Sequence, residues 1–117
     1  MTEPLLTTVV HHGGHWVVVE ARGEVDADTA PLLRRACIDA LAEHRHIVID
    51  LSGVTFLDSA GLSVLVGTMR RATTDGGAMR VVATSPAVLR VLRITALDEV
   101  FDLRATVADA VGAVDDA

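Results

Sequence analysis

Polar residues crowd one segment of this sequence, residues 50–62. It reads Asp-Leu-Ser-Gly-Val-Thr-Phe-Leu-Asp-Ser-Ala-Gly-Leu, and it connects a β-branched apolar run to a segment with helical periodicity. The ends of central strands are where α/β proteins commonly place their sites. If Asp58 caps the helix, Ser59 is its first residue, and the Ser59 hydroxyl lies beside unpaired backbone N–H groups and the positive end of the helix dipole. A phosphate group added to Ser59 can be accommodated there.

The helix that follows Ser59 has two different faces. At about 100° per residue, one face carries apolar residues that we expect to pack on a sheet: Leu62, Leu65, Met69 and Ala72. Another stripe offers a shallow surface to a second protein: Ser59, Ser63, Val66 and Arg70. The same stripe also fits an ordinary solvated helix face, so the residues alone leave both interpretations open.

Other kinds of site are disfavoured by the residues present. A hydrolytic triad at Ser59 lacks a Gly-x-Ser-x-Gly turn and an evident base. His11, His12 and His15 fall in a glycine-containing hairpin where alternate residues point to opposite faces, so we expect no metal site. Cys37, the one cysteine, is expected in the core, and the glycines form no phosphate-binding loop. We therefore expect neither an enzyme nor a bound cofactor.

Strands and helices alternate around this segment. Strands are expected at residues 5–11 and 15–21, paired as an antiparallel hairpin around Gly13 and Gly14. Further strands are expected at residues 46–51, 79–83 and 101–104, the first of them at the centre of the sheet. Residues 52–57 are expected to form a connecting loop.

Helices are expected between these strands. The first begins with Asp26 or Asp28 as N-cap and runs to about Glu43, with an inward face of Leu33, Ala36, Cys37, Ala40 and Leu41. The others are expected at residues 59–73, after Ser85-Pro86, and from 106 to about 114. The pattern predicts an α/β fold with a mixed central sheet of about five strands covered by about four helices. We expect one domain over residues 1–117, with short flexible ends at about 1–4 and 115–117.

Composition narrows the function classes. The chain has 117 residues, of which 50% are hydrophobic, and a formal net charge of -6. This charge repels nucleic acid and anionic lipid, so neither is an expected partner. Without a basic N-terminal stretch or a long apolar segment, we expect a cytoplasmic protein, present as a monomer or weak dimer.

The stretch from Ile47 to Arg70, centred on Asp58-Ser59-Ala60-Gly61-Leu62, resembles the signature of the STAS domain, and in particular of bacterial anti-sigma factor antagonists. Further matches are Gly23-Glu24-Val25-Asp26, Gly76-Gly77 and Ser85-Pro86-Ala87-Val88. The resemblance covers nearly the whole chain and implies a single STAS-like domain.

A partner-switching cycle is what this resemblance implies. The unphosphorylated antagonist binds an anti-sigma factor and so frees a sigma factor. The anti-sigma factor is typically a serine kinase with the histidine-kinase-like ATPase fold, and a PP2C-type phosphatase reverses the modification. By position, the phosphorylated serine falls on Ser59, its acidic neighbour on Asp58 and a strand-end polar residue on Asp50. Partner contacts are then expected from Asp26, Asp50, Thr55, Asp58, Ser59, Ala60, Gly61, Ser63, Val66 and Arg70.

Two positions depart from the usual pattern. Ser63 stands where the family often has glycine, which adds a hydroxyl near the expected docking stripe. Ala60 replaces a hydroxyl residue that commonly follows the phosphorylated serine, so Ser59 is the less ambiguous acceptor, with Thr55 and Ser63 as alternatives. The same fold also serves scaffold subunits of signalling assemblies and regulatory subunits of lipid or anion transporters, which is the alternative function.

Overall fold

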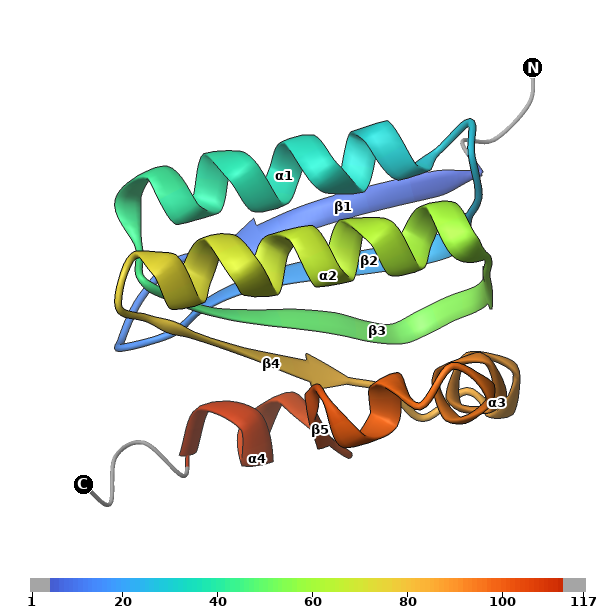
Figure 1. Ribbon diagram of the computed structural model, residues 1–117. Helices are drawn as coiled ribbons and strands as arrows, with labels where there is room; N and C mark the ends of the chain where they lie inside the picture. Colours follow the sequence, from blue (N-terminus) through green and yellow to red (C-terminus); the bar gives the residue numbers. More distant parts are fainter. Residues whose placement is uncertain (1–4, 113–117) are drawn as a thin grey trace.

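Five strands form one mixed sheet, in the order in which they occur along the chain (Figure 1). The computed structural model describes residues 5–112. β1 (Leu6–His11) and β2 (Val17–Val25) are antiparallel, and β3 (His46–Leu57), β4 (Ala78–Val82) and β5 (Asp102–Arg104) continue the sheet in parallel. The expected mixed five-stranded sheet is therefore confirmed. The ends that we expected to be flexible lie outside the described residues.

The β1–β2 hairpin closes through two glycines. Gly13 has a φ of 131° and Gly14 a φ of 67°, which are values that side chains disfavour. Along the hairpin Leu6 pairs with Gly23 and His11 with Val18. The expected antiparallel pairing is confirmed, and the second strand extends beyond the expected residue 21 to Val25.

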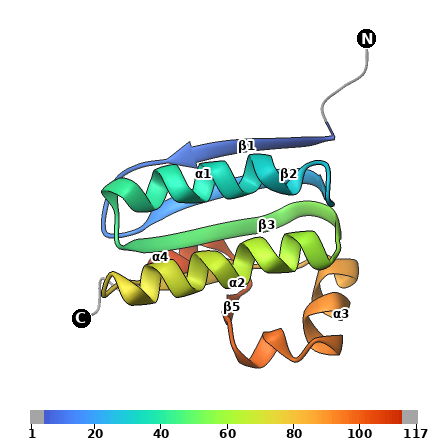
Figure 2. The same ribbon diagram turned by 45° about the horizontal axis from the view of Figure 1, so that its top comes forward.

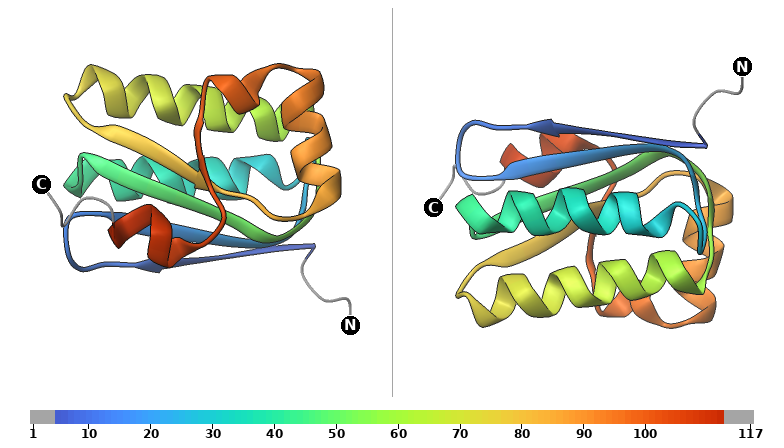
Figure 3. Two further views of the ribbon diagram at one scale, coloured as in Figure 1. Left: turned by 90° about the horizontal axis from the view of Figure 1, so that it is seen from below. Right: turned by 90° about the horizontal axis from the view of Figure 1, so that it is seen from above.

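Helices cover both faces of the sheet. α1 (Ala30–Glu43) and α2 (Ser59–Thr74) lie side by side on one face, as the view from above shows (Figure 3), and the short α4 (Val107–Gly112) lies on the other. α3 (Pro86–Ile94) lies at the end of the sheet where α2 begins, and a single 3-10 turn, η1 (Leu97–Glu99), connects it towards β5 (Figures 1 and 2). The expected fourth helix is confirmed as far as Gly112, and its expected end near residue 114 lies outside the described residues.

Strand alternation in β3 divides the core in two. Ile47, Ile49 and Leu51 join the larger cluster under α1 and α2, whereas Val48 joins the smaller cluster with Trp16. All four β3 residues are fully buried. A central strand buried on both faces reads as a continuous apolar run, which is why this strand was the clearest in the sequence.

The prediction of a loop at residues 52–57 is wrong. β3 continues through them to Leu57, because β2 continues alongside it and pairs Gly23 with Val54 and Val25 with Leu57. Val54 and Leu57 are buried with two exposed residues between them, so strict alternation is broken here. The pairing of β2 with β3 shifts register between Gly23 and Glu24, which is the irregularity that this spacing reflects.

Predictions of helix detail need two corrections. The N-cap position of α1 is Thr29 rather than Asp26 or Asp28, and the Thr29 side chain makes no capping hydrogen bond. The Asp26 carboxylate instead accepts the backbone N–H of Thr29 in a turn that precedes the helix. Its expected inward residues are buried except Ala36, which is partly exposed.

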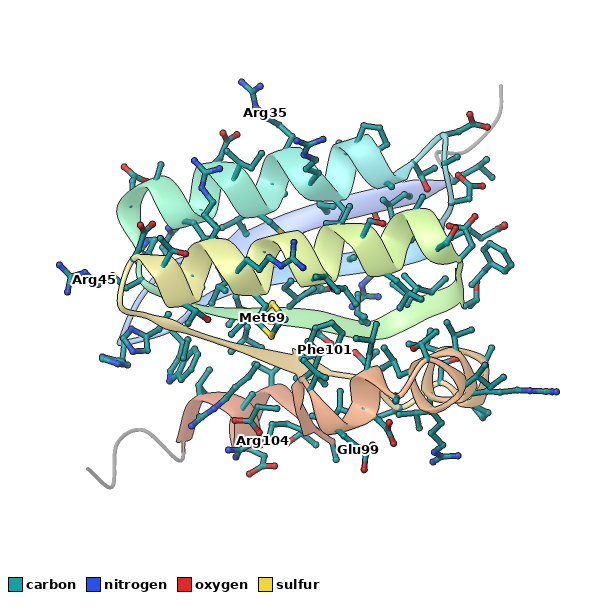
Figure 4. All side chains as sticks on the ribbon, in the orientation of Figure 1. Arg35, Arg45, Met69, Glu99, Phe101 and Arg104 are labelled. Atoms are coloured by element: carbon teal, nitrogen blue, oxygen red, sulfur yellow. The ribbon has the colours of Figure 1, made fainter. Side chains whose placement is uncertain are left out.

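In α2, the buried face is centred differently from the prediction. Val64 and Thr68 are buried, whereas Leu62 and Met69 are only partly buried. Met69 lies at the margin of the core, in the cluster that contains Phe101 (Figure 4). The helix therefore turns its buried side partly towards α1.

Candidate functional site

The candidate site is the β3–α2 junction, where α2 begins at Ser59. The carboxylate of Asp58 caps the helix: its Oδ1 accepts the backbone N–H of Ala60 at 2.9 Å and, more weakly, that of Gly61 at 3.5 Å. Asp58 has extended backbone geometry, as N-cap residues do. The predicted N-cap and helix start are confirmed.

Ser59 is exposed at the first position of α2. Its carbonyl oxygen accepts a hydrogen bond of 3.0 Å from the Ser63 hydroxyl one turn later. Among the residues that the structure describes, none makes a hydrogen bond to the Ser59 hydroxyl. This hydroxyl is thus reachable from solvent and close to the positive end of a helix of four turns.

A second loop adjoins the junction. The backbone N–H of Asp58 donates to the carbonyl oxygen of Val25 at 3.2 Å, which brings the loop between β2 and α1 next to the start of α2. In that loop Asp26 Oδ1 accepts the N–H groups of Asp28 and Thr29, each at 3.0 Å. The hydrogen bond from Thr29, above all, holds the pKa of the Asp26 carboxyl below its ordinary value. A carboxylate is therefore held in the loop that adjoins the start of α2.

Two residues at the end of β3 border the junction. Thr55 is exposed, and its hydroxyl donates weakly to the carbonyl oxygen of Gly23 at 3.4 Å. Phe56 is one of two phenylalanines in the chain, and it leaves 46% of its surface exposed. This exposure is unusual because phenylalanine is commonly buried. Phe56 was missed in the sequence, although an aromatic residue between polar residues was a signal that could have drawn attention to it.

The expected stripe along α2 is on the surface. Ser59, Ser63 and Arg70 are exposed, and Val66 is partly buried against the core. We call these four residues the α2 ridge. Their arrangement supplies hydroxyl, aliphatic and guanidinium groups along one line, which is a surface that a second protein can contact.

Two of the predicted contact residues flank the ridge differently. Ala60 is partly buried. Gly61 is buried, and a side chain there would meet Leu57 Cδ1 and Val25 Cγ1. Gly61 therefore allows α2 to approach the sheet, and we do not keep it among the surface contacts.

The placement of Asp50 at a strand end is wrong. It lies within β3, only 7% exposed, and its Oδ1 accepts the backbone N–H of Ser52 at 3.0 Å and the Ser52 hydroxyl at 2.7 Å. Because strand side chains alternate, Asp50 shares its face with Val48, opposite the face that α2 covers. Asp50 therefore lies well before the end of β3 and on the face opposite α2, away from the start of that helix at Ser59.

A groove of about 480 Å³ runs between α1 and α2 and reaches the junction. Its apolar lining includes Ala30, Ile38 and Val64, and its polar lining includes Arg34 and Arg71. Ala60 and Ser63 also border it, so the groove and the ridge share the first turn of α2. The groove was not foreseen, because it depends on how two helices pack.

The sequence of this chain matches a known protein family. The family model of the STAS domain matches residues 7–110. The chain belongs to the STAS domain family. Within residues 5–112, this STAS domain has no helix with both the length and the apolar character needed to cross a membrane.

Relatives of this STAS domain are named as antagonists of anti-sigma factors. It is 34% identical over 115 residues to the anti-sigma-F factor antagonist RsfB of Mycobacterium tuberculosis, covering 96% of this chain and 91% of the relative. It is 32% identical over 89 residues to the anti-sigma-B factor antagonist of Bacillus subtilis, covering 76% of this chain and 82% of the relative. The crystal structure of an anti-sigma factor antagonist from Mycobacterium paratuberculosis is similar, with a TM-score of 0.87, 38% identity, and coverage of 98% of this chain and 99% of that one. The resemblance seen in the sequence is confirmed at the level of the family.

Proposed function

We propose that this protein is an anti-sigma factor antagonist that binds its anti-sigma factor through the β3–α2 junction while Ser59 is unphosphorylated. Phosphorylation of Ser59 by the anti-sigma factor, acting as a serine kinase of the histidine-kinase-like ATPase fold, ends the complex. A PP2C-type phosphatase restores it. The observation that carries the proposal is the exposed Ser59, whose hydroxyl lies at the start of α2 next to the capping carboxylate of Asp58.

The helix itself tolerates a phosphate at Ser59. Negative charge near a helix N-terminus is stabilising, because the dipole and the free N–H groups favour anions. The N–H of Ala60 already donates to Asp58, so a phosphate has to share this end of the helix with an existing carboxylate. Phosphorylation should therefore change the surface of α2 and leave the fold in place.

Binding of a partner should respond much more strongly. A phosphate adds about -1.5 to -2 charges to a surface that fitted a neutral hydroxyl. The carboxylates of Asp58 and Asp26 lie on the two adjoining loops, so the modified site becomes strongly acidic. A coupling free energy of about 3 kcal/mol between phosphorylation and binding weakens the complex roughly a hundredfold.

The contact surface in this proposal combines the α2 ridge with its neighbours: Asp26, Thr55, Phe56, Asp58 and Ala60. Phe56 supplies an exposed aromatic side chain, the type of residue that most often anchors an interface. Arg70 supplies the positive charge at the far end of the ridge. Such a surface suits a partner with an apolar pocket near Phe56 and acidic groups facing Arg70.

The test is to incubate the protein with ATP and its candidate anti-sigma kinase and to measure intact mass and kinase binding. We expect a mass increase of about 80 Da for one phosphate, absent in Ser59→Ala and retained in Ser63→Ala. Binding should fall about a hundredfold after modification and recover after treatment with a PP2C-type phosphatase. The variant Ser59→Ala should bind with or without ATP.

Two results would overturn the proposal. A phosphate found on Ser63 or Thr55 in place of Ser59 would move the switch elsewhere. An unmodified protein that co-purifies with membrane transporter subunits, and with no kinase-like ATPase, would favour the alternative of a transporter-associated or scaffold subunit.

A further inference from the structure

Two histidines and a glutamate meet at the end of the molecule opposite the β3–α2 junction. His12 lies in the β1–β2 turn, Glu43 is the last residue of α1, and His44 is its C-cap. His12 Nδ1 and His44 Nε2 are 3.1 Å apart, and one ligand atom from each of the three residues lies within 4.8 Å of the others. Figure 1 shows the hairpin turn and the end of α1 at the same end of the molecule, where Figure 4 labels Arg45.

The spacing of these atoms suits a tetrahedral metal ion. Zinc binds imidazole nitrogen at about 2.0–2.1 Å, and two nitrogens at a tetrahedral angle then lie about 3.3–3.4 Å apart. The observed 3.1 Å between the two ring nitrogens needs only a small adjustment to reach this value. His12 and Glu43 are exposed and His44 is partly buried, so the side chains can move by a few tenths of an ångström and a water molecule can take the fourth position.

The choice of donors also selects a class of metal. Two imidazole nitrogens with one carboxylate suit zinc and similar transition metals, whereas magnesium and calcium prefer oxygen ligands throughout. We propose that His12, Glu43 and His44 form a binding site for a divalent transition-metal ion of the zinc type, which clamps the β1–β2 turn to the end of α1.

Binding requires a change of tautomer in one of the two rings. In the absence of a metal ion, the contact of 3.1 Å is a hydrogen bond, with a proton on one of the two facing nitrogens. When a cation takes that position, the proton moves to the other nitrogen of its ring, and both neutral imidazoles present a lone pair to the metal.

A neighbouring pair of histidines, His15 and His46, lies outside this site. The rings of His15 and His46 lie 4.1 Å apart between centroids, and His46 packs edge-on against Trp16 at 5.1 Å. Within residues 5–112, the grouping of metal-ligating side chains includes neither of them. The sequence prediction of no metal site took His11, His12 and His15 as hairpin residues and His44 and His46 as surface or strand-end residues. Nothing local in the sequence brings His44 and Glu43 to the hairpin.

The test is to titrate the full chain with zinc chloride and to measure binding by calorimetry. Thermal unfolding is then measured with and without zinc. We expect one zinc ion per chain, a rise in Tm with zinc and none with magnesium chloride. His12→Ala and His44→Ala should each weaken zinc binding at least about tenfold, and Glu43→Gln should weaken it measurably. His11→Ala is the matched control, since His11 is an exposed hairpin histidine bonded to Glu20, and it should bind zinc as the wild type does.

Equal losses in His11→Ala and His12→Ala, or zinc binding that leaves Tm unchanged or lowered, would overturn the site. Circular dichroism confirms that each variant is folded before the comparison. Ser59→Ala should bind zinc normally, so the outcome is independent of the proposed phosphorylation switch.

Discussion

The backbone amide of Asp58 donates a hydrogen bond to the carbonyl oxygen of Val25, with an N–O distance of 3.2 Å. This bond follows directly from the pairing of Val25 with Leu57 at the ends of β2 and β3. It places two segments with fixed carboxylates, Asp26 after β2 and Asp58 after β3, next to each other at the carboxyl ends of these strands. The environment of Ser59 is therefore set by a long-range strand pairing as well as by the helix that it begins.

The buried position of Gly61 makes it sensitive to substitution. In Gly61→Ala the new methyl group would meet the side chains of Leu57 and Val25, the latter at 2.9 Å, so we expect a loss of about 1–3 kcal/mol in the free energy of unfolding. Gly67→Ala in the same helix is the control: its methyl group meets nothing within 4 Å, and it should stabilise by about 0.5–1 kcal/mol. Urea unfolding measures both, and similar effects of the two substitutions would contradict the packing of α2 described here.

The cap provided by Asp58 should contribute to stability. Asp58→Ala removes the acceptor of the Ala60 and Gly61 N–H groups and should lower the free energy of unfolding by about 1 kcal/mol, within a range of 0.5–2. Asp58→Asn keeps an acceptor oxygen and should lose less. Urea unfolding of the three proteins checks this order, and an alanine variant as stable as the wild type would show that the cap has no energetic role.

Acid should remove the contribution of Asp26. The hydrogen bond from the Thr29 backbone lowers the pKa of this carboxyl in the folded state, so its stabilisation is complete above the ordinary value of 3.8 and is lost as the pH falls through the lower folded-state pKa. We expect Asp26→Asn to be less stable than the wild type at pH 7, and the difference to disappear in strong acid. Urea midpoints measured over this pH range test the prediction.

Asp28→Asn is the control for this experiment. Among the described residues, the Asp28 carboxylate accepts no hydrogen bond, although its backbone N–H donates to Asp26. The Asp28→Asn variant should follow the pH dependence of the wild type. A difference between wild type and Asp26→Asn that stays constant with pH would contradict the role of the Asp26 charge.

Cys37 should be inert in the folded protein. It is 1% exposed, and burial raises the pKa of its thiol to about 12. At pH 8 the thiolate is then about one part in ten thousand, and reagents that need a thiolate cannot reach it. We expect no reaction with Ellman's reagent in buffer and one reactive thiol in urea; fast labelling of the folded protein would show that α1 opens locally.

Short-range signals in the sequence were sufficient for the local features of the site. The Asp58 cap, the start of α2 at Ser59 and the Gly13-Gly14 turn all depend on contacts within a few residues, so residue types and spacing reveal them. The buried run of β3 was equally clear, because a strand covered on both faces is apolar throughout.

Long-range packing decided the rest. Whether residues 52–57 form a loop or a strand depends on how far β2 continues beside them. In the longer strand Asp50 lies well before the end, on the face opposite α2. The α1–α2 groove and the meeting of His12 with His44 join residues that are far apart in the chain. The sequence by itself determined the family, the central strand and the position of Ser59; the tertiary structure alone decided which side chains surround Ser59, because side chains brought together by strand pairing and helix packing leave no local pattern in the sequence.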